Sequence, residues 1–244
     1  PASTSTRARV SRPPGGVPRA CGEEAASITP ELPLRHLLPD WVPPGYGTPL
    51  LVAISGPTAV GKTTVLRRLR TLDRPYHVVV TVTTRAPRPG EAHGRDYFFV
   101  TPDEFRAMAA QGAFLEYARV HGTDYYGTPR AQVREALARG LDVIVPPDVQ
   151  GAAAIRAAVP GAVTIFLAAR SLDELERRLR LPERGHSEEE IQRRLATARM
   201  EMARLHEFDY LVINEEGRLD ATVLEIDLII QAEKRRVRRA PIAV

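Results

Sequence analysis

The sequence predicts an α/β domain built on a parallel β-sheet with helices on both faces. Short apolar segments alternate with amphipathic, helix-forming segments between residues 49 and 236. The first apolar segment, 50–55, runs directly into a Gly-Pro turn, and the segment 162–168 is apolar almost throughout. Strands without polar alternation are typical of a parallel sheet that is buried on both faces, and the intervening helices supply the crossovers.

Apolar and β-branched runs mark the strands. Residues 78–83 are β-branched throughout, which favours a strand, and the run at 141–145 lies between two turn signals. The strands expected from these patterns cover residues 50–55, 78–83, 141–145, 162–168 and 210–214.

Caps and helix breakers mark the helices. Thr101 and Ser171 are N-cap residues, and Ser187 with Glu190 forms the pattern of a capping box. Gly140 follows the end of a helix that begins with a proline. The helices expected from these signals cover residues 63–70, 102–111, 129–139, 172–180, 188–205 and 219–235.

The composition excludes several classes of protein. The chain has 244 residues, 43% of them hydrophobic, and its longest apolar runs are too short to span a bilayer, which excludes a transmembrane protein. The single cysteine, Cys21, excludes a disulfide framework and a cysteine-built zinc site. The net charge of +4 comes with arginine-rich ends, which we interpret as solvated tails rather than a nucleic-acid surface. With no secretory segment visible, a cytoplasmic location is expected.

Three parts are expected along the chain. Residues 1–48 hold nine of the 21 prolines and show no sustained periodicity, so an irregular extension with one short docked segment at 36–42 is predicted. A single domain is expected over 49–236, followed by a basic tail over 237–244.

The most specific motif follows the first strand. Residues 56–63 read GPTAVGKT, the pattern of a phosphate-binding loop in its required place between a strand and a helix. Lys62, one of only two lysines in a chain with 34 basic residues, would reach the β- and γ-phosphates, and the Thr63 hydroxyl would ligate Mg²⁺. The ATP-binding residues expected here are Gly56, Pro57, Thr58, Ala59, Val60, Gly61, Lys62, Thr63 and Thr64.

Later segments carry groups suited to a phosphate monoester. Arg85 and Arg88 are three residues apart with Pro87 between them, and two guanidinium groups can bracket one dianionic phosphate. Tyr97 and Tyr126 add neutral donors. Glu116 lies in the apolar stretch AFLEY and needs hydrogen-bond donors there, because a bare buried carboxylate is costly. Guanine offers two adjacent donors, its ring N1–H and exocyclic amine, whereas adenine lacks this pair.

These motifs, in this order over residues 50–233, resemble those of the guanylate kinases. The resemblance implies a P-loop NTPase-type sheet, a small subdomain for the nucleoside monophosphate over 84–127 and a helical lid over 179–206. The core would then comprise 49–83, 128–178 and 207–236. It also implies that the enzyme uses ATP with Mg²⁺ to phosphorylate GMP and dGMP. The GMP-binding residues implied are Thr81, Arg85, Arg88, Tyr97, Glu116, Tyr126, Thr128 and Asp148.

The resemblance also implies a set of catalytic cations. Lys62 and Arg85 would stabilise the transferring group, together with the lid residues Arg184 and Arg194. Arg180 and Asn214 would bind ATP. We interpret the remaining basic residues of this region as a charged helix face that pairs with Glu183, Glu188 and Glu189; these residues are Arg177, Arg178 and Arg193.

Three departures from the family pattern stand out. Pro146 occupies the place of an acid near Mg²⁺, the loop 121–125 is one residue longer than usual, and 181–183 looks like an insertion in the lid. The partners expected are ATP and GMP, with no nucleic acid and no membrane, for a monomer or homodimer. Two alternatives stay open: a binding module with impaired catalysis, favoured by Pro146, and a kinase for another phosphorylated acceptor, disfavoured by Glu116.

Overall fold

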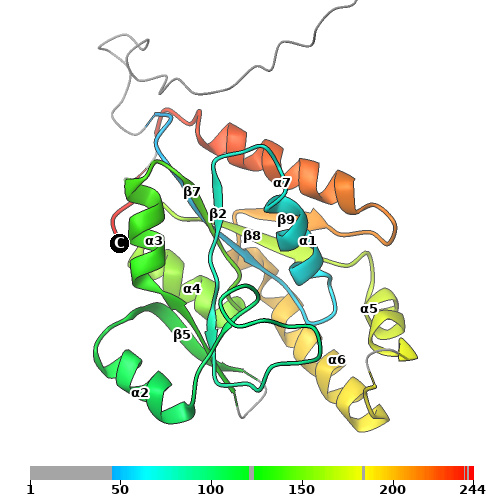
Figure 1. Ribbon diagram of the computed structural model, residues 1–244. Coiled ribbons are helices and arrows are strands. Elements are labelled where there is room, and N and C mark those ends of the chain that lie inside the picture. Colours follow the sequence, from blue (N-terminus) through cyan, green and yellow to red (C-terminus); the bar gives the residue numbers. More distant parts are fainter. Residues whose placement is uncertain (1–45, 121–123, 183–184, 239, 241) are drawn as a thin grey trace, which may run out of the picture. The chain divides into compact units, whose positions relative to one another are not determined.

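The computed structural model describes residues 46–120, 124–182, 185–238, 240 and 242–244 (Figure 1). The extension predicted over 1–48 therefore lies outside the described residues except for 46–48. Arg184 and part of the loop 121–125 also lie outside them.

The larger sheet has the strand order β2-β7-β1-β8-β9, and all neighbouring strands are parallel. Strand β1 lies at its centre and is buried along its whole length. Alternate residues of β1 face two different core clusters, because successive side chains of a strand point to opposite faces. The predicted buried parallel sheet is confirmed. Its strands are β1 (Leu51–Ser55), β2 (Tyr76–Val78), β7 (Asp142–Val145), β8 (Val163–Ala168) and β9 (Tyr210–Ile213).

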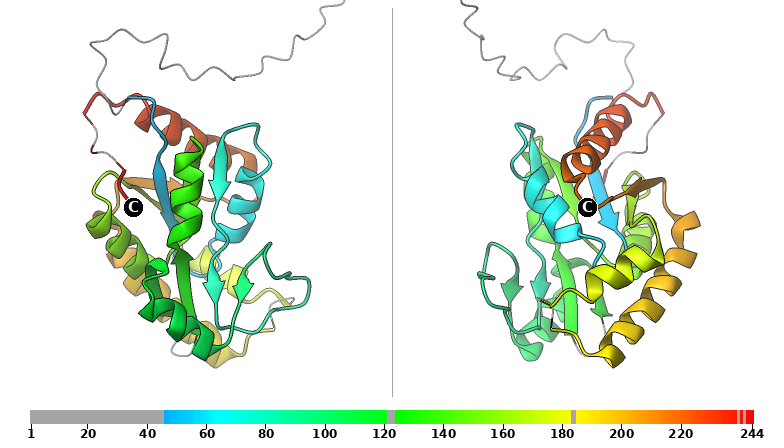
Figure 2. Two further views of the ribbon diagram at one scale, coloured as in Figure 1. Left: turned by 60° about the vertical axis from the view of Figure 1, so that its left-hand side comes forward. Right: turned by 90° about the vertical axis from the view of Figure 1, so that its right-hand side faces the viewer.

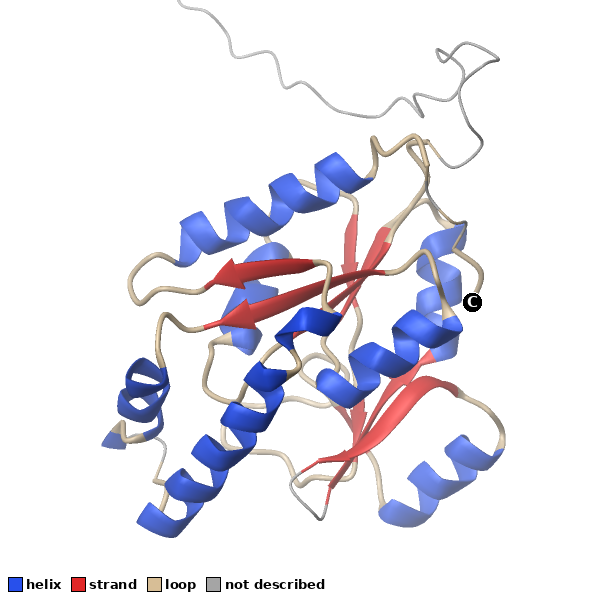
Figure 3. Cartoon of the chain, turned by 180° about the vertical axis from the view of Figure 1, so that it is seen from behind, coloured by secondary structure: helices blue, strands red, loops and turns tan. Residues whose placement is uncertain are grey.

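Helices cover both faces of this sheet (Figures 1 and 3). One core cluster receives buried residues from α1 (Lys62–Leu69), α5 (Leu172–Leu179), α6 (Glu188–Ala203) and α7 (Leu219–Glu233). The other receives them from α3 (Arg130–Ala138) and α4 (Val149–Ala158). A short 3-10 helix, η3 (Leu205–Glu207), connects α6 to β9.

A smaller, mostly antiparallel sheet has the order β4-β3-β6-β5. It packs on α2 (Pro102–Ala110) through a cluster in which the rings of Phe105 and Phe114 stack with centroids 4.5 Å apart. The smaller sheet and the pair α5 and α6 extend from the same end of the larger sheet (Figure 2). Its strands are β3 (Val82–Thr83), β4 (Phe98–Phe99), β5 (Phe114–Val120) and β6 (Asp124–Pro129).

The strand predicted over 78–83 is wrong as a single element. The chain leaves the larger sheet after Val78 and joins the smaller one at Val82. Between them, the side-chain amide of Gln132 accepts from the Val80 N–H (3.1 Å) and donates to the Val80 carbonyl (3.0 Å). Gln132 therefore satisfies backbone groups that a strand would otherwise pair. The smaller sheet also extends beyond the predicted subdomain bounds of 84–127.

The expected helices are present within a few residues of their predicted ends, and one more was missed. Helix α4 begins after Asp148, whose carboxylate accepts from the Gly151 N–H at 2.7 Å. The predicted caps at Thr101, Ser171 and Ser187 are confirmed, since each side chain accepts from the N–H three residues later. Thr101 forms a reciprocal capping box with Glu104. The capping box predicted for Ser187 with Glu190 is wrong, because the Glu190 carboxylate binds Arg194 instead of the Ser187 N–H. No helix in the described part of the chain combines the length and apolarity needed to cross a membrane.

A buried ion pair fastens α7 to the larger sheet. The Lys234 ammonium lies 2.7 Å from Oδ2 of Asp142, which is fully buried, and Oδ1 of Asp142 accepts from the Leu50 N–H at 2.9 Å. The second lysine of the chain is therefore a structural residue. Removal of one partner would leave a buried charge without compensation.

We expect Lys234→Ala to lower the free energy of unfolding by about 3 kcal/mol, because removing one partner of a buried ion pair leaves the charge of the other partner buried and unpaired. Urea denaturation at neutral pH measures this, with Lys234→Arg as the control that keeps the positive charge. A loss below about 1 kcal/mol for the alanine variant would show that water screens Asp142 in place of the lysine.

Candidate active site

The phosphate-binding loop is held tightly against strand β8. A Cβ atom at Gly56 would lie 2.1 Å from the carbonyl oxygen of Leu167, so only glycine fits there. Gly61 has φ 95° and precedes α1 as its N-cap, with no side chain capping the helix. The first-turn N–H groups of α1 therefore have no side-chain acceptor from the N-cap. This arrangement suits a phosphate group.

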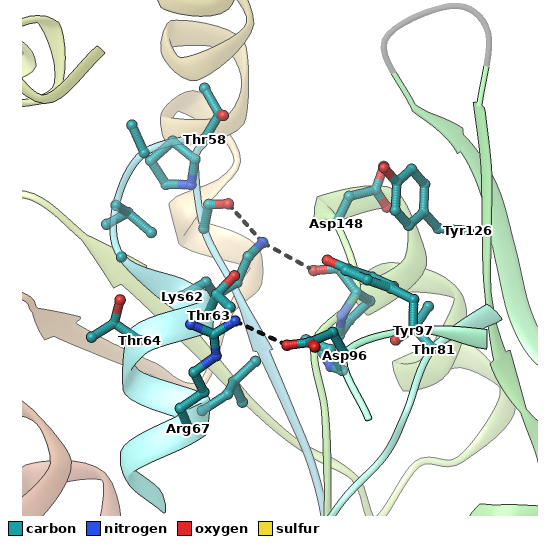
Figure 4. Close-up of a pocket in the computed structure, with 18 of the residues that line it drawn as sticks. Thr58, Lys62, Thr63, Thr64, Arg67, Thr81, Asp96, Tyr97, Tyr126 and Asp148 are labelled. Carbon is teal, nitrogen blue, oxygen red and sulfur yellow. Dashed lines mark hydrogen bonds and ion pairs between the residues drawn. The ribbon is translucent and has the colours of Figure 1, made fainter. Parts of the chain in front are cut away.

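Lys62 reaches across the end of the sheet from the loop. Its ammonium donates to the carbonyl oxygens of Gly56 (3.0 Å) and Pro147 (3.4 Å), which follow the neighbouring strands β1 and β7 (Figure 4). Burial lowers the pKa of Lys62, while the negative charges of Glu201 and Asp148 oppose this change. Neutral carbonyl groups thus hold the ammonium, and no carboxylate lies within 4.0 Å of it among the described residues.

A single cleft of about 450 Å³ connects the loop to the smaller sheet. In Figure 4, Lys62 and Thr63 lie on one side, and Tyr97, Tyr126 and Thr81 lie on the other. Arg67 of α1 forms an ion pair with Asp96 at 2.9 Å between the two sides. The sequence-predicted residues that line the cleft are the loop residues 56–64 together with Thr81, Arg88, Tyr97, Glu116, Tyr126, Thr128, Asp148 and Arg194.

Glu116 projects from β5 into the cleft and is only 8% exposed. Its partner across the strand pair is Thr128, whose hydroxyl donates to Oε1 at 2.6 Å. Gly151 approaches from the start of α4, where a Cβ atom would lie 2.5 Å from Oε2. Burial raises the pKa of Glu116 to about 7, with Thr128 acting against the rise and Asp148 adding to it. The carboxylate is therefore desolvated and only partly satisfied by the protein.

Arg85 is held beside the cleft rather than in its lining. Its guanidinium donates to both oxygens of Glu91 at 2.9 Å and to the Tyr126 hydroxyl at 3.2 Å. It also lies 5.4 Å from the centre of the Tyr97 ring. The Arg88 side chain lines the cleft and has no hydrogen bond or ion pair with a described residue. Sequence reasoning missed Glu91, although an acid six residues after Arg85 in a basic loop was a usable signal.

The predicted lid arginines lie in different surroundings. Arg194 donates to the Thr58 hydroxyl at 3.1 Å and to Glu190, so helix α6 contacts the phosphate-binding loop. Arg180 instead binds Glu176 and Glu188 and is not part of the cleft lining. Arg184 lies outside the described residues.

Asn214 holds the phosphate-binding loop at Val60. Its side-chain amide donates to the Val60 carbonyl at 2.7 Å, and its oxygen accepts from Thr222. Arg178 also donates to the Val60 carbonyl, at 3.0 Å, and its side chain is only 12% exposed. The interpretation of Arg178 as part of a helix face that pairs with Glu183, Glu188 and Glu189 is therefore wrong, because its guanidinium contacts the loop and Glu174. A hydrogen bond to the loop could not be inferred from the charge pattern of the helix alone.

Strand β7 brings prolines to the edge of the cleft. Pro146 and Pro147 both line it, so the side chain at the end of this strand offers no carboxylate. Asp148 follows, with one oxygen engaged in the cap of α4. A further acid, Glu201 of α6, also lines the cleft, and sequence reasoning did not single it out. The described residues contain no cluster of three or more metal-ligating side chains.

Comparison with known proteins gives one consistent result. The guanylate kinase family model matches residues 48–233. A guanylate kinase of Mycolicibacterium paratuberculosis is 46% identical over 185 residues, covering 75% of this chain and 82% of that protein. The protein named guanylate kinase 2, chloroplastic/mitochondrial, from Oryza sativa subsp. japonica is 42% identical over 197 residues, covering 80% and 68%.

A solved structure agrees with the sequence comparison. The crystal structure of guanylate kinase from Anaplasma phagocytophilum matches with a TM-score of 0.65 and 28% identity, covering 78% of this chain and 89% of that one. The family match, residues 48–233, extends over most of the chain and includes the strands of both sheets. The chain therefore belongs to the guanylate kinase family.

Proposed function

We propose that this protein transfers the γ-phosphoryl group of ATP to GMP or dGMP, giving ADP and the nucleoside diphosphate. One observation carries the choice of acceptor. A desolvated carboxylate, Glu116, lies in the same cleft as a phosphate-binding loop. The cleft thus combines a triphosphate site with a site that requires two adjacent hydrogen-bond donors.

The triphosphate binds at the loop 56–64. The loop N–H groups and the positive end of α1 hold the phosphates, and Lys62 moves from its carbonyl partners to the β- and γ-phosphate oxygens. Oxygen donors in the cleft, namely the Thr63 hydroxyl and the carboxylates of Asp148 and Glu201, fit a hard divalent cation. Thr63 would hold Mg²⁺, which supplies charge neutralisation on the phosphates.

Guanine binds against Glu116 and the residues around it. The ionised carboxylate accepts from N1–H and from the exocyclic amine of guanine, and these donors offset the cost of its burial. Thr81 and Thr128 line the same region and add hydroxyl groups, and Asp148 offers its second oxygen. A base without both donors leaves part of the buried charge unsatisfied, which gives selectivity for guanine.

The monophosphate binds between the tyrosines and the two arginines of the basic loop. Tyr97, Tyr126 and Arg88 already line the cleft, and Glu91 fixes the Arg85 guanidinium against the Tyr126 hydroxyl. Arg85 and Arg88 neutralise the acceptor phosphate, so that its oxygen can attack the γ-phosphoryl group in line.

The lid completes the electrostatics of the transfer. Arg194 lies beside the loop at Thr58 and would stabilise charge on the transferring group together with Arg184, while Arg180 would bind ATP when the lid closes. Asn214 acts through the loop that it supports. Closure also excludes water, which would otherwise hydrolyse the donor.

The cellular location, oligomeric state and partners of the enzyme stay predictions. A cytoplasmic location is expected from the sequence, although one relative is named as chloroplastic/mitochondrial. A monomer or homodimer without nucleic-acid partners is expected.

A binding module with impaired catalysis is the second candidate, and Pro146 favours it. P-loop NTPases commonly place an aspartate near the metal at this part of the sheet. The intact loop and Lys62 support the enzyme instead. A kinase for a sugar phosphate would not need the buried Glu116.

We expect GMP to give the highest kcat/KM when ADP formation is coupled to a spectroscopic assay with ATP, Mg²⁺ and each of GMP, dGMP, AMP and IMP. In Glu116→Ala, the preference for GMP over IMP falls about 10- to 100-fold, because IMP lacks only the exocyclic amine. The exposed Glu135→Ala variant is the control. Measurable GMP binding with no turnover of any nucleotide would support the binding module.

We expect Glu116→Gln to stabilise the protein at alkaline pH. Because the pKa of Glu116 is raised from 4.5 to about 7, the native state binds this proton more tightly than the unfolded chain does. The free energy of unfolding therefore falls as pH rises through this interval. The glutamine cannot ionise, so its advantage is about 3 kcal/mol at about pH 8 and vanishes near pH 4. Urea denaturation at both pH values measures it; an equal difference at both would contradict this account.

We expect Pro146→Asp to raise kcat several-fold with little change in the KM for GMP, because a carboxylate there would help to hold the metal. Pro146→Asn is the matched control, with similar size and no charge. If the aspartate and asparagine variants have the same kcat, the absent acid does not limit the rate.

A further inference from the structure

We propose that Arg67 is a positioning residue that fixes the acceptor side of the cleft relative to the phosphate-binding loop through its ion pair with Asp96. The proposal rests on the function proposed above, because it concerns how the two nucleotide sites of that reaction are aligned. It gives a task to an ion pair of the cleft lining that the proposed reaction does not otherwise use.

Helix α1 joins Arg67 firmly to the phosphate-binding loop. The helix begins at Lys62, and Arg67 follows on the same helix. At a rise of about 1.5 Å per residue, the backbones of the two residues are about 7 Å apart along the helix axis. Buried side chains of α1, among them Val65 and Leu69, pack into the core on one face of the larger sheet. The backbone of Arg67 is therefore fixed relative to the loop, and its guanidinium reaches Asp96 on the other side (Figure 4).

Asp96 uses its two carboxylate oxygens in different directions. Oδ2 accepts from the Ala92 N–H at 3.0 Å and from the Arg95 guanidinium at 2.9 Å, so it stabilises the turn that contains Asp96. Oδ1 accepts from the Arg67 guanidinium at 2.9 Å. The Asp96 side chain is only 7% exposed. The Ala92 N–H and then Arg67 lower the pKa of Asp96 below its ordinary value, so the carboxylate stays charged at neutral pH.

A second arginine of α1 contacts the same turn. Arg70 lies three residues after Arg67, which places the two side chains on the same face of the helix. Its guanidinium donates to the Arg95 carbonyl at 3.2 Å, and both arginines line the cleft. The turn is thus bound to α1 through the side chain of Asp96 and through the backbone of Arg95.

The turn leads directly into the acceptor side of the cleft. Tyr97 follows Asp96 and lines the cleft, with its ring centre 5.4 Å from the guanidinium carbon of Arg85 and 6.0 Å from the centre of the Tyr126 ring. A displacement of Asp96 would therefore displace groups assigned to the acceptor phosphate. In-line transfer depends on alignment, and a misplacement of about 1 Å can cost about 100-fold in rate.

Other contacts hold the base end of the cleft. Arg130 of α3 donates to the Phe114 carbonyl of β5 at 3.1 Å, and Gly151 of α4 lies against Glu116. These contacts do not involve α1. Loss of the Arg67 contact should therefore disturb the alignment of the acceptor phosphate more than the binding of the base.

Three substitutions test the ion pair. Arg67→Met removes the guanidinium, keeps an unbranched stem and leaves both Oδ2 contacts of Asp96 in place. Arg67→Lys keeps the positive charge, and an ammonium can replace the single nitrogen that contacts Oδ1. Arg68→Met is the matched control, since Arg68 is the next residue of α1, pairs with Asp220 at 2.8 Å and lies outside the cleft lining.

Two readouts are measured on the full chain. The first is steady-state kinetics, with kcat, the KM for ATP and the KM for GMP determined separately. The second is the distance between spin labels on Ala107→Cys in α2 and Glu225→Cys in α7, both exposed positions, in a Cys21→Ser background without nucleotide. The distance requires no turnover and tests the alignment even if the wild-type protein proves inactive toward GMP. Failure of the function and failure of the proposal are therefore distinguishable.

We expect Arg67→Met to lower kcat about tenfold, with the KM for ATP and the KM for GMP each changed less than about twofold. Its distance distribution should be about 1.5-fold wider than that of the wild type, because the turn loses one of its two contacts with α1. Arg67→Lys should recover kcat to within about threefold of the wild type, and Arg68→Met should match the wild type in both readouts. In an Asp96→Ala background, Arg67→Met should lower kcat no further, because the two residues act through one contact.

The proposal is overturned if Arg67→Met matches Arg68→Met in distance distribution or, where GMP is turned over, in kcat. It is also overturned if Arg67→Lys is as slow as Arg67→Met. A rise in the KM for GMP that accounts for the whole loss in kcat/KM would overturn it as well, because Arg67 would then bind the substrate rather than position the subdomain. Should Arg67→Met fail to fold, Arg67→Gln is compared with Arg68→Gln in the same assays.

Discussion

The close contact between Gly56 and strand β8 is the constraint on which the cleft depends. The carbonyl of Leu167 leaves no room for a side chain at position 56, so the loop can turn tightly at the end of β1. Because β1 lies between β7 and β8, this turn brings Lys62 over the ends of two neighbouring strands. The ammonium is held there by two neutral carbonyl groups. A lysine held in this way keeps its charge for a polyanion, whereas one in a direct ion pair would first have to lose its partner.

The second half of the cleft depends on a different sheet, and its central group is also a buried charge. The register of β5 and β6 places Glu116 opposite Thr128, and this hydroxyl supplies one hydrogen bond to the carboxylate. One bond does not replace the hydration of an ionised carboxylate, which explains why the pKa of Glu116 is raised to about 7. In the proposed function, the cost of this group to stability is what would give it value as a recognition element. A base with two adjacent donors relieves that cost, and a base with one donor relieves it only in part.

Sequence reasoning succeeded where the signal is local. The phosphate-binding loop is a contiguous motif between a strand and a helix, and Glu116 stands out because its neighbours are apolar. It failed where the outcome depends on contacts between distant segments. Val82 and Thr83 form a strand because they pair with Phe98 and Phe99 on one side and with Tyr126 and Gly127, more than 40 residues later, on the other. Arg178 and Arg180 lie two residues apart on one helix, yet the first contacts the loop and the second binds surface acids. Which helix face meets the loop is fixed by packing, and a charge pattern does not encode it.

Two arginines outside the cleft lining, Arg180 and Arg85, differ in how firmly the protein holds them, and this difference bears on which of them can move. Arg180 binds Glu176 and Glu188 through side chains that are largely accessible to water, and exposed ion pairs of this kind contribute little to stability. Arg180 can therefore exchange these carboxylates for phosphate oxygens at small cost. Arg85 and its partner Glu91 are much less exposed, and the Tyr126 hydroxyl accepts from the same guanidinium. In the proposed function, Arg85 would therefore be oriented before substrate arrives, and the acceptor side of the cleft would be preorganised while the lid side retains freedom to close.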